Sequence, residues 1–196
     1  MVATSPLEQP LAQRRRSARI ILRRLHELYP EMGTALDYDD PWQLLVSTVL
    51  SAQTTDDNVN RVTPVLFSRW PTPEDLAAAA PEEVESVVYS TGFYRQKTKS
   101  ILALAADIVE KFDGEVPRDL NAMVTLRGVG RKTASVVLAE VWGDAAIAVD
   151  THVKRVTRRL GLTAHTDPAK IENDLKELYL QKTWAGISMR FIQFGR

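Results

Sequence analysis

The chain has 196 residues, 44% of them hydrophobic, which is enough for one large domain or two small ones and excludes disorder throughout. Its 25 basic and 25 acidic residues cancel, so the whole-chain charge neither indicates nor excludes a nucleic-acid partner. The absence of cysteine excludes disulfides, a catalytic thiol and thiolate metal sites within these residues. No window is apolar and long enough to span a membrane, so we expect a soluble, cytoplasmic protein.

Apolar residues recur at helical spacing along most of the chain, and proline and glycine separate these stretches. No run alternates as a strand would, so the predicted fold class is all-α, with about ten helices. The elements predicted in the first half are a helix over Ser17–Leu28, a buried central helix that begins at Asp40-Pro41 and ends in the polar segment 51–56, two short helices that break near Pro81 and Gly92, the first of them capped by Thr72 and Asp75, and a long helix from about Tyr94 to Phe112.

In the second half, a short helix from about Leu120 leads into a glycine turn, and a very apolar helix follows. The connections are short enough for a compact helical body. The remaining predicted elements are a basic helix that begins at Asp150-Thr151 and ends at Gly161, a helix that begins at Asp167-Pro168, and a last helix over Thr183–Phe194.

The glycine turn lies in the string Leu-Arg-Gly-Val-Gly-Arg-Lys-Thr-Ala at residues 126–134. Gly128 and Gly130 permit positive φ and let the backbone approach another molecule closely. Their amides precede a helix start, where the helix dipole favours an anion such as a DNA phosphate. A bare Gly-x-Gly turn is more often only structural. This string is more specific, because an apolar helix and then Val-Asp-Thr-His at 149–152 follow it.

These two strings together resemble the endonuclease III branch of the helix-hairpin-helix DNA glycosylases. Residues 50–56, 92–94 and 114–117 also match that family in order and spacing, so the resemblance extends from about residue 17 to the end. It implies a six-helix barrel domain at residues 34–144, with the helix-hairpin-helix at about 120–142. A second helical domain is expected from residues 17–33 with 145–196, and residues 1–16 are interpreted as a flexible basic arm.

The resemblance implies a bifunctional DNA glycosylase and AP lyase of base excision repair. Such an enzyme removes oxidised pyrimidines from duplex DNA and cleaves the abasic strand by β-elimination through a lysine Schiff base. Lys132 is then the nucleophile and Asp150 its carboxylate partner, while Gln53 and Phe93 fill the gap that the extruded nucleotide leaves.

The chemistry suits these residue types. A lysine amine attacks the sugar only when it is unprotonated, which desolvation or a neighbouring positive charge such as Arg131 favours. A carboxylate such as Asp150 stabilises an oxocarbenium-like sugar, although Asp150 is also an ordinary helix N-cap and we expect both roles. The amide of Gln53 can hydrogen-bond the orphaned base, and the ring of Phe93 can wedge into the stack.

The distribution of charge along the sequence predicts a DNA-binding face, although the net charge of the whole chain is zero. Residues 126–160 carry seven basic and three acidic side chains, and such a face binds phosphates without regard to sequence. His152 is expected to be structural or phosphate-contacting rather than catalytic. The predicted DNA contacts are Gln53, Phe93, Gly128, Gly130, Arg131, Thr133, His152, Lys154 and Arg155.

The chain departs from the family pattern in two places. The family carries a 4Fe-4S cluster on four cysteines shortly after a His-Gly-Arg segment, whereas this chain reads Phe194-Gly195-Arg196 and has no cysteine. Either the sequence stops just before the cluster or the chain is a cluster-free relative, and we favour the former; no cofactor or metal is expected on these residues. Arg127 replaces a usual proline, at a position that we expect to need no special geometry.

Two alternatives stay open. A monofunctional mismatch adenine glycosylase has a small hydroxyl residue where Lys132 stands, and a non-catalytic helix-hairpin-helix DNA-binding module does not require Lys132, Asp150 and Gln53 together. The expected partner is double-stranded DNA with damaged bases or abasic sites, bound by a monomer at the bacterial nucleoid, with no membrane partner.

Overall fold

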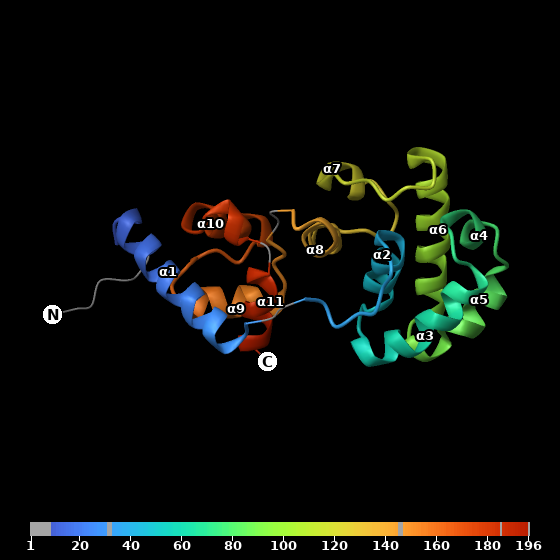
Figure 1. The fold of residues 1–196 in the computed structure, drawn as a ribbon, viewed down its shortest axis with the longest axis horizontal. Helices are drawn as coiled ribbons and strands as arrows, with labels where there is room; N and C mark the ends of the chain where they lie inside the picture. Colours follow the sequence, from blue (N-terminus) through green and yellow to red (C-terminus); the bar gives the residue numbers. More distant parts are fainter. Residues whose placement is uncertain (1–8, 31–32, 145–146, 185, 196) are drawn as a thin grey trace. The chain divides into compact units, whose positions relative to one another are not determined.

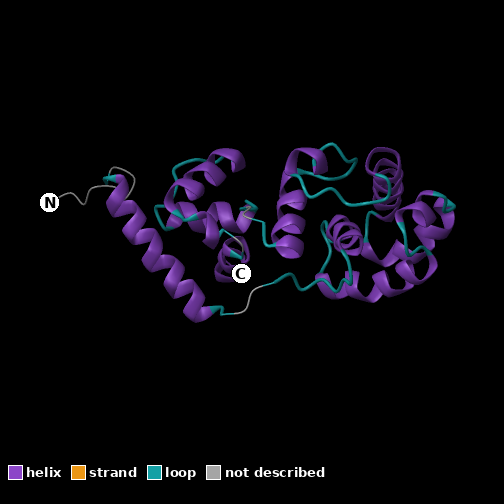
Figure 2. Cartoon of the chain, turned by 45° about the horizontal axis from the view of Figure 1, so that its top comes forward, coloured by secondary structure: helices purple, strands orange, loops and turns teal. Residues whose placement is uncertain are grey.

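The computed structural model describes residues 9–30, 33–144, 147–184 and 186–195, and every regular element in these ranges is a helix (Figures 1 and 2). The predicted all-α fold class is confirmed. The chain divides into two compact units, Ala35–Val141 and Met1–Thr34 with Trp142–Arg196, which we call the central unit and the terminal unit. The domain boundaries expected from the sequence stay a prediction. No helix in the described ranges is long and apolar enough to cross a membrane.

The central unit is built around the long helix α6, against which α2, α4 and α5 pack (Figure 1). The short helix α2 is almost entirely buried, as its uniformly apolar sequence predicted. The helices of this unit are α2 (Pro41–Leu50), α3 (Asp56–Arg69), α4 (Pro73–Ala77), α5 (Pro81–Val88), the 3-10 helix η2 (Tyr89–Thr91), α6 (Tyr94–Phe112), α7 (Leu120–Met123) and α8 (Arg131–Trp142).

Local capping signals position these helices where the sequence predicted them. The Asp40 carboxylate accepts the Gln43 amide at 2.8 Å, and Pro41 occupies the first turn of α2. The predicted capping box of α4 is also present, because Thr72 and Asp75 each accept the other's backbone amide. Side-chain caps therefore satisfy amides that have no partner within the helix.

The terminal unit packs α11 against α9 and α1, and α1 against α10. Its core is a single apolar cluster that includes Leu25, Ile171 and the fully buried ring of Phe191. Arg190, also buried, donates to the carbonyls of Tyr29 and Pro30. The helices are α1 (Leu11–Leu28), α9 (Thr151–Arg159), α10 (Pro168–Leu178), the 3-10 helix η3 (Gln181–Thr183) and α11 (Ile187–Gly195).

Two expectations about the helices were wrong, and one helix was not expected. Helix α1 begins at Leu11 rather than Ser17, so residues 11–16 are helical and not part of a flexible arm; the first eight residues lie outside the described ranges. Helix α3 was not predicted. The predicted last helix is divided, because Gly186 takes a positive φ of 73° between η3 and α11.

Candidate active site and nucleic-acid interface

The glycine hairpin connects α7 to α8 in the central unit. Leu126 and Val129 are buried, so these two side chains anchor the turn in the core. Gly128 has a φ of 83°, and a Cβ added there would lie 3.2 Å from the Ser100 Cβ on α6. A Cβ added to Gly130 would meet no atom of the described residues within 4 Å, apart from its neighbours in sequence. The hairpin therefore packs on α6 through Gly128 and leaves open space at Gly130.

Arg127 holds this hairpin to α6 through Asp107. The Arg127 amide donates to Asp107 Oδ2 at 2.8 Å, and its guanidinium donates to both carboxylate oxygens at 3.0 Å. Burial acts to raise the pKa of the Asp107 carboxyl, but hydrogen bonds from Arg127 and Lys111 outweigh it and hold that pKa well below its ordinary value. Arg127 therefore makes contacts that a proline, which has no amide to donate, would lack, and the expectation that position 127 needs no special geometry stays a prediction.

Lys132 lies in the first turn of α8, directly after the hairpin. Arg131 and Lys132 are exposed, Thr133 is half-buried, and the opposite face of α8 buries Ala134 and Val137. The apolar face fixes the helix in the core, so the amphipathic pattern of α8 presents the lysine to solvent. The first turn of a helix is also the end at which backbone amides favour an anion.

Gln53 and Phe93 occupy two turns of the central unit, one after α2 and one before α6. Both have left-handed backbones, with φ of 56° and 48°, and the Phe93 side chain is 68% exposed. The structure connects these turns through Asn58 Nδ2, which donates to Thr54 Oγ1 at 3.0 Å and to the Ser90 carbonyl at 2.8 Å. Sequence reasoning missed Asn58, whose partner Ser90 is remote in sequence.

Asp150 is the N-cap of α9 in the terminal unit. Its Oδ1 accepts the Val153 amide at 2.8 Å, so the capping role predicted for it is confirmed. Lys132 and Asp150 belong to different units. Their proximity stays a prediction.

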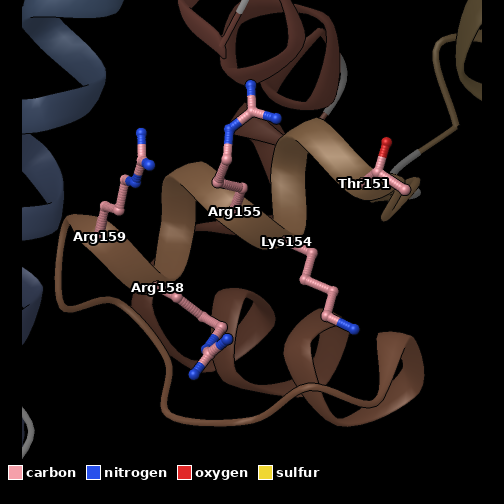
Figure 3. A pocket seen from close by; sticks show the side chains of 5 residues that line it. All are labelled: Thr151, Lys154, Arg155, Arg158 and Arg159. Carbon is pink, nitrogen blue, oxygen red and sulfur yellow. The ribbon is translucent and has the colours of Figure 1, made fainter.

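The basic helix α9 carries a pocket lined by Thr151, Lys154, Arg155, Arg158 and Arg159 (Figure 3). Lys154 and Arg158 point to one side of the helix in this view, and Arg155 and Arg159 point to the other. Lys154 and Arg158 are four residues apart, and so are Arg155 and Arg159. This spacing places the two members of each pair on the same face of the helix. The helix thus presents two basic edges.

Two of the predicted DNA contacts bind the end of α11 instead of pointing away from the protein. Arg155 donates a hydrogen bond to the Gly195 carbonyl, and His152 Nδ1 lies 3.3 Å from the same oxygen. A Cβ added to Gly195 would lie 3.0 Å from Val156 Cγ2, so α11 approaches α9 closely at this glycine. His152 and Arg155 therefore have a structural role in the terminal unit.

The residues present do not fit an iron–sulfur cluster. The sequence has no cysteine, and no group of three or more His, Cys, Asp or Glu suited to a metal occurs within the described part of the chain.

The hairpin, the helical units and the comparison with known proteins define the class of this protein. The family model for the HhH-GPD superfamily of base excision DNA repair proteins matches residues 46–181. Endonuclease III from Synechocystis sp. is 49% identical over 193 residues, which cover 98% of this chain and 88% of the relative. Endonuclease III from Bacillus subtilis is 43% identical over 176 residues, or 89% and 80% of the two chains.

A solved structure of a trapped endonuclease III–DNA covalent intermediate matches with a TM-score of 0.87 and 40% identity, covering 92% of this chain and 85% of that one. The chain belongs to the endonuclease III family. It is a base excision repair enzyme, a DNA glycosylase with AP lyase activity.

Proposed function

We propose that Lys132 is the nucleophile of both reactions, that Asp150 is its carboxylate partner, and that the substrate is an oxidised pyrimidine in double-stranded DNA. The observation that carries this proposal is the hairpin, which presents an exposed lysine in the first turn of α8 beside the open backbone at Gly130. A phosphate held by the amides of this turn would bring the adjoining sugar toward the lysine.

The amine and the carboxylate account for the two reactions in sequence. Lys132 Nζ bonds to the sugar C1′, the bond to the damaged base breaks, and the base leaves with a proton. The negative charge of Asp150 stabilises the cationic sugar at this step. The C1′–O4′ bond then breaks, O4′ takes up a proton, and the opened sugar is joined to Lys132 as a protonated Schiff base. This Schiff base acidifies the C2′ proton. Removal of that proton expels the 3′ phosphate, and water releases the lysine.

Two observations support a covalent mechanism over the alternatives. One similar structure is named as a trapped endonuclease III–DNA covalent intermediate, and such an intermediate requires a protein nucleophile. In this chain, position 132 carries an amine where a mismatch adenine glycosylase has a small hydroxyl residue. A non-catalytic binding module would need no nucleophile there.

Borohydride trapping tests the proposal. The parent protein should form a reduced covalent adduct with duplex DNA that contains an abasic site, and Lys132→Ala should form none. Lys154→Ala removes a different lysine and should still form the adduct at saturating DNA. Circular dichroism and DNA binding check that Lys132→Ala is folded. An adduct that persists in this variant assigns the nucleophile elsewhere, and no adduct with the parent favours a binding module.

The substrate and setting belong to the same proposal. Two similar structures are endonuclease III–DNA complexes, so we infer that this chain also binds DNA, as a monomer, at damaged bases or abasic sites. The similar proteins come from bacteria, which supports an enzyme that acts on the nucleoid in the cytoplasm. A panel of lesion duplexes tests the substrate class: thymine glycol should be removed faster than a mismatched adenine.

A further inference from the structure

The turns that carry Gln53 and Phe93 both hold strained backbones. A non-glycine residue with positive φ is uncommon, and such a conformation persists only where the surrounding structure enforces it. Gly92 also has a positive φ of 71°, so the Phe93 turn contains two such residues in succession. Contacts that enforce these two turns are therefore contacts that position the side chains at their tips.

Asn58, in the first turn of α3, makes such contacts with both turns. Its Nδ2 donates at 3.0 Å to Thr54 Oγ1, beside Gln53, and at 2.8 Å to the carbonyl of Ser90, in η2 before Phe93. Arg61 donates to Asn58 Oδ1 at 3.2 Å, which fixes the orientation of the amide. The amide is thus arranged so that both of its N–H groups serve the two turns.

A second side chain also holds the Phe93 turn. Lys97 is buried, and its Nζ donates to the Thr91 carbonyl at 2.7 Å. Its own amide donates to the Phe93 carbonyl at 3.0 Å. Lys97 fixes this turn to α6 but has no contact with the Gln53 turn among the described interactions. Asn58 is therefore the connection between the two turns, and Lys97 is an anchor for one.

We propose that Asn58 is a positioning residue that couples the two turns, so that Gln53 and Phe93 enter the DNA duplex as one rigid unit. The inference rests on the proposed gap-filling role of these two residues. Extrusion of a paired nucleotide costs unstacking and unpairing energy, which the inserted side chains must offset. Two turns held in advance lose less conformational freedom on insertion than two turns that move separately.

The chain offers a matched control two residues further along α3. Asn60 makes the same kind of bridge, because its Nδ2 donates to the Ala35 carbonyl at 2.8 Å and its Oδ1 accepts the Asp37 amide at 3.0 Å. That bridge holds the segment before α2 and touches neither turn. Asn58→Asp and Asn60→Asp each remove the amide donors while preserving shape, so they differ in which segment is released.

The experiment compares these variants on a thymine glycol duplex and on an abasic-site duplex, under single-turnover conditions. A 2-aminopurine beside the lesion reports base extrusion by its fluorescence. Asn58→Asp should slow the fluorescence rise and base removal about tenfold relative to Asn60→Asp, the effect of one or two lost hydrogen bonds. Both variants should cleave the abasic duplex at the parental rate, because that site has no base to unstack.

Two further variants separate the possible failures. Thr54→Val removes only the acceptor in the Gln53 turn and should give a smaller effect in the same direction, which preserves the test if Asn58→Asp folds poorly. Phe93→Ala tests the gap-filling role itself. Normal base removal by Phe93→Ala would refute that role. If Phe93→Ala removes the base slowly but Asn58→Asp removes it as fast as Asn60→Asp does, the gap-filling role stands and only the coupling is refuted.

Discussion

At position 150 a single carboxylate has two possible roles, and the two make different demands on the side chain. The cap of α9 needs an oxygen that accepts the Val153 amide, which Asp150 Oδ1 supplies at 2.8 Å. An asparagine oxygen satisfies that need equally well. Stabilisation of a cationic sugar needs the negative charge, which asparagine lacks. The amide variant therefore separates the structural role from the catalytic one.

Asp150→Asn should leave the free energy of unfolding within about 0.5 kcal/mol of the parent while it lowers the single-turnover rate of base removal about 100-fold. Thermal or urea unfolding gives the first quantity, and a thymine glycol duplex gives the second. Asp150→Ala should lose about 1 kcal/mol of stability in addition. If Asp150→Asn keeps the parental rate, the carboxylate is a helix cap and no more.

At the scale of elements, the hairpin depends on α6 as much as on its own turn. A Cβ at Gly128 would lie against Ser100 on α6, and Arg127 bonds to Asp107 about two turns further along the same helix. Asp107 is buried and also pairs with Lys111 at 2.8 Å, so its charge is held by several donors. The position of Lys132 is thus set by a helix that contributes no proposed catalytic residue. A change at Asp107 should act on stability first.

Asp107→Asn should reduce the free energy of unfolding at pH 7 by about 2 kcal/mol, because charge-assisted hydrogen bonds to a buried carboxylate are lost. The substitution should also change how the free energy of unfolding depends on pH. The pKa of Asp107 is lowered in the folded protein, so its contribution is complete above the unfolded value of 3.8 and is lost as the pH falls below it.

Urea unfolding at pH 7 and at pH 3 checks this expectation. The difference in stability between the parent and Asp107→Asn should be large at the higher pH and smaller at the lower one. Glu115→Gln removes an exposed carboxylate outside this hydrogen-bonded set, so it is the control and should follow the parent at both. Equal differences at the two pH values would show that the Asp107 charge contributes nothing to the attachment of the hairpin.

At the scale of the whole molecule, the features that could be predicted from the sequence are those that nearby residues determine. The caps at Asp40 and Asp150 follow from residue type and spacing alone, and so does the glycine turn at Gly128. The start of α1 escaped prediction because Pro10 makes no side-chain cap. Helix α3 escaped although Val59, Val62 and Leu66 lie at helical spacing, because Pro64 stands inside it and proline usually ends a helix.

The contacts that escaped prediction join residues remote in sequence. Asn58 and Ser90 are 32 positions apart, Arg127 and Asp107 are 20 apart, and Arg155 and Gly195 are 40 apart. Tertiary packing brings these pairs together, and no periodic pattern marks them. The candidate DNA contacts were chosen from charge and resemblance, which do not reveal that Arg155 already bonds a carbonyl of α11.

The total charge of the chain is zero, so its affinity for DNA depends on where the basic residues lie. The tertiary contacts divide the basic residues of α9 into a structural set and a DNA-binding set. Lys154 and Arg158 should carry the phosphate contacts, whereas Arg155 holds the end of α11. Each phosphate contact contributes about 0.9 to the slope of log K against log salt concentration. Lys154→Gln with Arg158→Gln should therefore lower the magnitude of that slope by about 1.8 for undamaged duplex DNA.

Fluorescence anisotropy across a salt series measures the slope, and two variants separate the explanations. Lys154→Arg with Arg158→Lys keeps both charges and should keep the slope, because point charges on phosphates do not require one type of side chain. Arg155→Gln should leave the slope nearly unchanged but lower the melting temperature, since it frees the Gly195 carbonyl. A slope that falls with Arg155→Gln and not with the double variant would place the DNA on the other edge of α9.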